Sequence, residues 1–141
     1  MTYFARALGA SHTRDNAKAI AAIDSLTSIE QRLRAYGEGY WAEQVAIERL
    51  GASAWLELAQ NRDSDALAHM REAAAREDST EKSAVTPGPL APARELLGDM
   101  LVALGKPAEA SAEYRATLAK EPNRRHASER LKAISGKSAG S

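Results

Sequence analysis

The sequence predicts an all-α protein made of antiparallel helical hairpins stacked as a short α-solenoid. Three observations predict this fold. The chain of 141 residues is rich in alanine, the best helix former, and has only nine glycines and five prolines. Apolar residues recur with the helical spacing i, i+3, i+4, i+7, and no segment has the alternation of a half-buried strand. Helix–turn–helix segments also recur along the chain.

The chain is expected to begin with a short helix over residues 3–9, which Gly9 ends. Thr13 or Asp15 then caps a second helix, because their side-chain oxygens can accept hydrogen bonds from free N–H groups of the first turn. The buried stripe of that helix consists of Ala19, Ile20, Ile23 and Leu26.

A long helix is expected from about Tyr40 to Gln60, after a break at Gly37 and Gly39. It is apolar on two sides, which is typical of a helix packed on two sides. One face contains Ile47, Leu50, Gly51, Ala54 and Leu58, and the other contains Trp41, Val45, Ala52, Leu56 and Ala59.

A fourth helix follows a turn at residues 61–65, with Asp63 or Ser64 as its cap. Its buried positions are Ala66, Leu67, Met70, Ala73 and Ala74. Residues 78–92 contain three prolines and a glycine without periodicity, so they are expected to form a loop.

Residues 96–122 indicate two helices joined by a corner at residues 105–107 and closed by Pro122. Asn123 is expected to cap a last helix, whose narrow apolar stripe consists of Ala127, Leu131 and Ile134. Residues 136–141 are expected to be a flexible tail.

Residues 105–122 superpose on residues 61–78, and the helices before them also match. The matched positions are Ala110 with Ala66, Tyr114 with Met70, Thr117 with Ala73 and Leu118 with Ala74, and then Arg94, Leu97, Gly98 and Leu101 with Arg49, Ala52, Ser53 and Leu56. A third copy places Ala19, Ile23 and Leu26 at the same positions. Because each hairpin alone leaves an apolar face bare, the copies are expected to stack.

The last hairpin resembles the tetratricopeptide repeat. The positions that define this repeat are occupied by Leu97-Gly98, Leu101, Ala110, Tyr114, Thr117 and Pro122, within its period of about 34 residues. The sequence departs from the pattern at Arg94, where an aromatic residue is preferred, and at Thr117, where alanine is preferred. The match is strong for 91–122, moderate for 46–79 and weak for 3–26.

We therefore expect one helical-repeat domain over residues 1–135. Its repeat units are expected at about 3–26, 40–79 and 91–122, with a capping helix over 123–135. A plain antiparallel helical bundle is the alternative, because such a bundle also needs small residues at its contacts and Gly-Pro corners.

The resemblance implies a protein–protein interaction module, in which the first helix of each hairpin lines a concave groove for a peptide or partner protein. The residues expected to face this groove are Glu95, Asp99 and Val102 from the last hairpin and Leu50, Ala54 and Glu57 from the middle one. Glu95 and Asp99 lie one helical turn apart, which favours a basic or neutral partner. The alternatives are that these positions are merely solvated, or that Arg94 and nearby basic side chains neutralise them.

The leading functional hypothesis is a scaffold or adaptor. The alternative is a regulatory or accessory helical-repeat segment of a larger enzyme or sensor protein. The first helix is short, and Tyr3, Phe4 and Leu8 have no preceding repeat to cover them. This edge is expected either to support a weak homodimer or to indicate a fragment of a longer chain.

No set of residues indicates catalysis, so we expect neither enzyme activity nor a cofactor. Asp65, His69 and Glu72 share a helix face at a spacing that could hold a metal, but a solvated helix exterior is the favoured interpretation. Residues 135–138 read SGKS, yet Leu131 stands where a phosphate loop needs its first glycine.

Charge and hydropathy exclude further classes of partner. The 19 basic and 19 acidic residues balance, so no overall field favours nucleic acid. A basic stretch from Lys120 to Lys137 could contact phosphates, but solubilising the last helix is the more frequent use of such charge. We expect no membrane partner, since no apolar run reaches the roughly 18 residues of a span. No secretory signal is visible, which favours a cytoplasmic protein.

Overall fold

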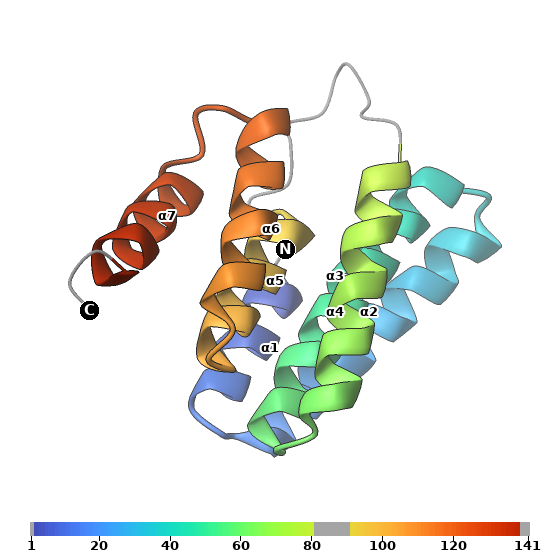
Figure 1. The fold of residues 1–141 in the computed structure, drawn as a ribbon. Coiled ribbons are helices and arrows are strands. Elements are labelled where there is room, and N and C mark those ends of the chain that lie inside the picture. Colours follow the sequence, from blue (N-terminus) through green and yellow to red (C-terminus); the bar gives the residue numbers. More distant parts are fainter. Residues whose placement is uncertain (1, 81–90, 139–141) are drawn as a thin grey trace. The chain divides into compact units, whose positions relative to one another are not determined.

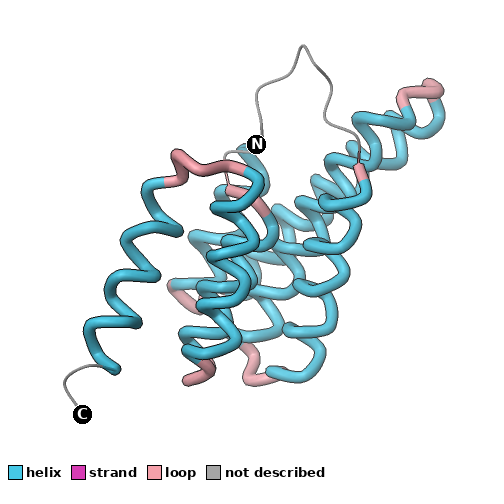
Figure 2. Tube along the Cα trace, turned by 45° about the horizontal axis from the view of Figure 1, so that its top comes forward, coloured by secondary structure: helices cyan, strands magenta, loops and turns pink. Residues whose placement is uncertain are grey.

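The computed structural model describes residues 2–80 and 91–138 and is all-helical (Figures 1 and 2). No strand occurs in these two ranges. The elements are α1 (Thr2–His12), α2 (Asn16–Ala35), α3 (Gly39–Ala59), α4 (Asp63–Ser79), α5 (Ala93–Ala103), α6 (Pro107–Lys120) and α7 (Arg125–Ser138). The all-α prediction is confirmed. Of the predicted loop over 78–92, residues 81–90 lie outside the described residues, and α4 continues through Ser79.

The chain divides into two compact units, Met1–Glu81 (the N-terminal unit) and Lys82–Ser141 (the C-terminal unit). In the N-terminal unit α1 packs on α2, and α3 packs on α1, α2 and α4. In the C-terminal unit α6 packs on both α5 and α7. Contact of α3 with three helices explains why it is apolar on two sides. A single domain over 1–135 stays a prediction.

Small side chains make the core of the N-terminal unit. One cluster joins α1, α2 and α3 through Ala7, Ala22, Leu26 and Ala52, against which Phe4, Ile23 and Val45 pack. A second cluster consists of Ala10, Ala19 and Leu56. Alanines at these contacts let the helix axes approach closely, which is why an alanine-rich sequence can bury a core with few large residues.

The α1–α2 turn differs from the sequence prediction in where the first helix ends. Gly9 does not end α1, which continues to His12. The left-handed residue of the turn is Arg14, with φ of 57°. The Thr13 hydroxyl donates to carbonyl oxygens at the end of α1, whereas Asp15 caps α2 by accepting from the Lys18 backbone N–H at 3.2 Å. The end of a helix thus depends here on its caps rather than on a glycine.

Helix α2 is longer than the periodicity indicates. It extends to Ala35, and Gly37 then adopts the left-handed conformation with φ of 77°. Beyond Leu26 the helix is stabilised by polar contacts, because Glu30 accepts from Arg34 on α2 and from Arg49 on α3. The predicted burial of Ile20 is wrong, since its side chain is exposed and the buried stripe instead includes Ala22.

Helix α4 has the predicted buried stripe but not the predicted cap. Ala66, Leu67, Met70, Ala73 and Ala74 are all buried. The capping position is occupied by Arg62, which makes no side-chain capping hydrogen bond, while Asp63 is already helical. The turn is made by Asn61 with φ of 60°, and the Arg62 guanidinium bonds to Asp65 in the first turn. The expected cap at Asp63 or Ser64 is therefore wrong.

The α5–α6 hairpin has the predicted corner. Gly105 takes the left-handed conformation with φ of 71°, and Pro107 begins α6, where its missing N–H costs no hydrogen bond. Helix α7 begins at Arg125, so Asn123 is not its cap, and the Arg124 carbonyl accepts the first backbone bond, from Ser128. Residues 136–138 are helical rather than part of a flexible tail.

Candidate functional site on helix α5

The C-terminal unit is organised around a close approach of α5 and α6. A Cβ atom at Gly98 would lie only 2.6 Å from Cε1 of Tyr114, so no other residue fits there without movement of the ring. Four further positions of the repeat pattern are buried, namely Leu97, Leu101, Ala110 and Thr117. Pro122, which closes the pattern, is exposed.

Tyr114 fixes the carboxylate of Asp99. The Tyr114 ring is fully buried, and its hydroxyl donates a 2.6 Å hydrogen bond to Asp99 Oδ1. Burial raises the pKa of Tyr114 far above its ordinary value, and the hydrogen bond to Asp99 raises it further. The phenol therefore stays a neutral donor. It holds Asp99 in one orientation on the surface of α5, which is how a preorganised recognition group is built.

Glu95 and Asp99, here called the acidic pair, bind basic side chains from α7 and its N-terminal flank. Arg124 Nε and Nη2 each lie 3.4 Å from a carboxylate oxygen of Glu95. Asp99 accepts from His126 Nε2 at 2.9 Å and from Arg130 Nε at 3.1 Å. Because a carboxylate can only accept, the proton of His126 in this contact lies on Nε2.

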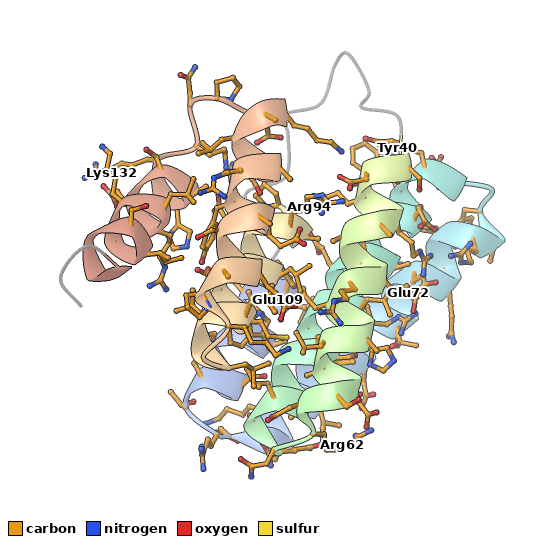
Figure 3. All side chains as sticks on the ribbon, viewed as in Figure 1. Tyr40, Arg62, Glu72, Arg94, Glu109 and Lys132 are labelled. Carbon is orange, nitrogen blue, oxygen red and sulfur yellow. The ribbon has the colours of Figure 1, made fainter. Side chains whose placement is uncertain are left out.

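The acidic pair is thus neutralised inside the C-terminal unit. The sequence left open whether Arg94 performs this role. In the structure Arg94 Nη1 lies 2.5 Å from Glu113 of α6, while Arg124, His126 and Arg130 surround the pair. Figure 3 shows Lys132 on the side of α7 that faces away from α6. His126 and Arg130 of α7 therefore contact α5, whereas Lys132 is exposed.

The structure places the six predicted groove residues as follows. Glu95, Leu50, Ala54 and Glu57 are buried, and Asp99 and Val102 are half-buried. Glu57 lies 2.7 Å from His69 Nδ1 of α4 and 3.7 Å from the Arg62 guanidinium. Because the two units are not placed relative to one another, a groove that combines residues of α3 and α5 stays a prediction. Within α5, Glu95 and Asp99 both contact basic side chains of α7 or its N-terminal flank.

The predicted metal-spaced residues contact other side chains. Asp65 pairs with Arg62 and Glu72 with Arg76, while His69 Nδ1 lies 2.7 Å from Glu57. Among the described residues, no group of three or more histidine, cysteine or acidic side chains is arranged to hold a metal.

Sequence reasoning missed an exposed aromatic surface where α2 meets α3. Tyr36 is 78% exposed, Tyr40 and Trp41 are exposed beside it, and the Tyr40 and Trp41 rings meet edge to face at 5.1 Å. The assignment of Trp41 to a buried face of α3 is wrong, because the first turn of α3 extends past the helices that cover its middle. The neighbouring glycines, Gly37 and Gly39, were the available signal.

The N-terminal edge is partly covered by its own unit. Phe4 packs against the cluster that contains Ala7 and Ala52, while Tyr3 is exposed. Trp55 of α3 is buried against the His12 ring, with ring centroids 4.6 Å apart. Its Nε1 has no hydrogen-bond partner among the described residues. Dimerisation through this edge stays a prediction.

An ionic network joins α2, α3 and α4 at the other side of the N-terminal unit. Arg76 of α4 donates two hydrogen bonds of 2.7 Å to Glu43 of α3, and Arg34 of α2 lies 3.8 Å from the same carboxylate. The hydrogen bond from Arg76 lowers the pKa of Glu43, against the opposing effect of burial. We interpret this network as stabilising the packing of the three helices rather than as a binding site, because its charged side chains pair with one another.

Comparisons of the chain with protein-family models, with curated proteins and with solved structures each found no match. Within residues 2–80 and 91–138, none of the helices combines the length and apolar character that crossing a membrane requires.

Proposed function

We propose that the chain is a helical-repeat interaction module of the tetratricopeptide type, which binds a peptide or partner protein and acts as a scaffold or adaptor. The single observation that carries this proposal is the contact of Gly98 with Tyr114, at two positions that define the repeat. The stacking of α3 on both helices of the preceding hairpin is a second support, because successive repeats pack in this way.

The binding surface in this proposal is the face of α5 that carries the acidic pair. Its carboxylates lie one helical turn apart, and Asp99 is oriented by Tyr114 before any partner arrives. Rigid acceptors lower the entropic cost of binding, and charge-assisted hydrogen bonds to lysine or arginine would supply specificity. A basic segment is therefore the favoured partner.

The test is a partner recovered by pull-down and then measured against variants of the purified chain. In Glu95→Gln with Asp99→Asn the side chains keep their shape and their oxygen acceptors but lose their charge. We expect weaker partner binding and a smaller dependence on salt concentration. Asp24→Asn with Asp63→Asn is the matched control, because it removes the same charge from two exposed positions of the N-terminal unit. Equal binding by both double variants would refute the proposed surface.

A further inference from the structure

We propose that the face of α5 and α6 under α7 is a binding site for a basic amphipathic helix, and that α7 is its built-in, displaceable occupant. This inference rests on the proposed function and names the class of partner. It begins from the observation that a basic helix of the chain itself already sits on the acidic pair.

The apolar part of the α7 attachment is small. Among the residues of α7 whose side chains are described, Ala127 is the one that is buried, and it contributes a single methyl group. Leu131 and Ile134 are half-buried. Hydrophobic attachment grows with the apolar area removed from water, so this helix is held more weakly than a helix anchored by fully buried leucines.

The polar part of the attachment is partly open to water at α7. The side chains of His126 and Arg130 are about half exposed, and water therefore competes with their contacts to Asp99. The two bonds from Arg124 to Glu95 are long, at 3.4 Å. The short connection to α6 adds to these contacts, because a tethered helix has an effective concentration of about millimolar at the surface.

The acceptor side, in contrast, is built into α5 and α6. Asp99 accepts a hydrogen bond from the Tyr114 hydroxyl of α6, a contact that does not involve α7. Glu95 is only 6% exposed while α7 is in place. Departure of α7 would remove the cations that contact both carboxylates, and another basic segment would restore these charge-assisted contacts. The surface therefore favours exchange of one basic helix for another.

The contacts of α7 indicate what a replacing helix must carry. Arg124 and Arg130 meet the two carboxylates, and Ala127, midway between them, lies against the surface. The recognised chemistry is thus a basic helix with one cation just before its first turn, a second cation six positions further on and a small residue midway between them. A partner with better apolar contacts beside this pattern would displace α7.

The test uses the full-length chain and a free synthetic peptide of residues 123–138, with binding measured by calorimetry. Ala127→Glu places a charge at the buried centre of α7 and should release the helix without changing α5 or α6. Because the occupied site is closed to the peptide, we expect the released variant to bind it about tenfold or more tightly than the natural chain does. A second variant, Arg124→Glu with Arg130→Glu, releases α7 by repulsion and keeps Ala127, in case the first fails to fold.

The acceptor side is tested in the released chain. Adding Glu95→Gln with Asp99→Asn should reverse the gain in peptide affinity, whereas adding Asp24→Asn with Asp63→Asn should not. If folded released variants bind the peptide no more tightly than the natural chain, or bind it regardless of the acidic pair, the inference is wrong.

The same variants separate this inference from the proposed function. A recovered partner that ignores the acidic pair, while the peptide depends on it, would refute the proposed function and leave the α7 site standing. A partner that depends on the pair, together with released variants that fail to bind the peptide, would refute the α7 site and leave the proposed function standing.

Discussion

Replacement of Gly98 by alanine is the sharpest test of how α5 and α6 pack. The added Cβ would lie 2.6 Å from Cε1 and 2.8 Å from Cζ of the Tyr114 ring. Carbon atoms in contact are normally about 3.5–4.0 Å apart, so the ring or the helix would have to move by about 1 Å. The ring is fully buried and bonded through its hydroxyl to Asp99, so it has little room to move.

The expected magnitude follows from two opposing effects. Overpacking of a core costs about 1–3 kcal/mol, and a strained bond from Tyr114 to a carboxylate adds to that cost. Replacing a helical glycine by alanine returns up to about 1 kcal/mol. We therefore expect Gly98→Ala to lower the free energy of unfolding by about 1–2 kcal/mol.

Gly51 provides the matched control within the same chain. It is also a buried glycine inside a helix, but a Cβ there would meet Phe4 at 3.6 Å, an ordinary contact. Gly51→Ala is expected to stabilise by about 0.4–1 kcal/mol, with the opposite sign to Gly98→Ala. Urea denaturation followed by far-ultraviolet circular dichroism measures both changes.

A double-mutant cycle ties the loss to the Tyr114 ring. In a Tyr114→Leu background the ring is gone, so Gly98→Ala should lose most of its cost. A Gly98→Ala variant as stable as the natural chain, or one with the same cost in both backgrounds, would refute the packing argument.

Three further outcomes are expected. Tyr114→Phe removes the donor to the acidic pair and should cost about 1.5–3 kcal/mol, measured by urea denaturation, and a cost below about 0.5 kcal/mol would contradict the preorganised carboxylate. Because the folded pKa of Glu43 is lowered from 4.5, its contribution to stability is present above that value and is lost as pH falls through the lowered pKa. Between neutral and acid pH, the unfolding midpoint of Glu43→Gln should therefore fall less than that of the natural chain. An equal fall in both proteins would show that the contact of Glu43 with Arg76 does not contribute to the loss of stability in acid. Trp41→Ala should stay within about 0.5 kcal/mol of the natural chain, whereas Leu26→Ala, at a buried position, should cost about 2–5 kcal/mol by thermal or urea unfolding.

The sequence was sufficient where a local pattern determines the structure. The corner at Gly105 and Pro107 and the buried stripe of α4 follow from backbone preference and helical period, and both are confirmed. Helix ends were less predictable, because they depend on competing caps. Thr13 bonds backwards and Asp15 bonds forwards, although both are good capping residues.

Only the acidic pair of the candidate site could be predicted from the sequence, and its basic partners could not. The spacing of Glu95 and Asp99 on one helix face is a local property, so the sequence alone indicates it. Their partners Arg124 and Arg130 lie about 30 positions further on, and no periodicity links them to α5. The exposure of Trp41 was missed for a related reason. A helix pattern shows which side is apolar, but not how far the covering helices extend.

The tryptophans provide an intrinsic fluorescent probe of one of the two units. Both tryptophans of the chain, Trp41 and Trp55, belong to the N-terminal unit, one exposed and one buried against His12. Indole emission therefore reports the melting of that unit alone, while the amide signal at far-ultraviolet wavelengths averages over all seven helices of the described residues. Superimposable curves from the two probes would mean that the units unfold as one cooperative block. Separated curves would give the free energy of unfolding of each unit by itself.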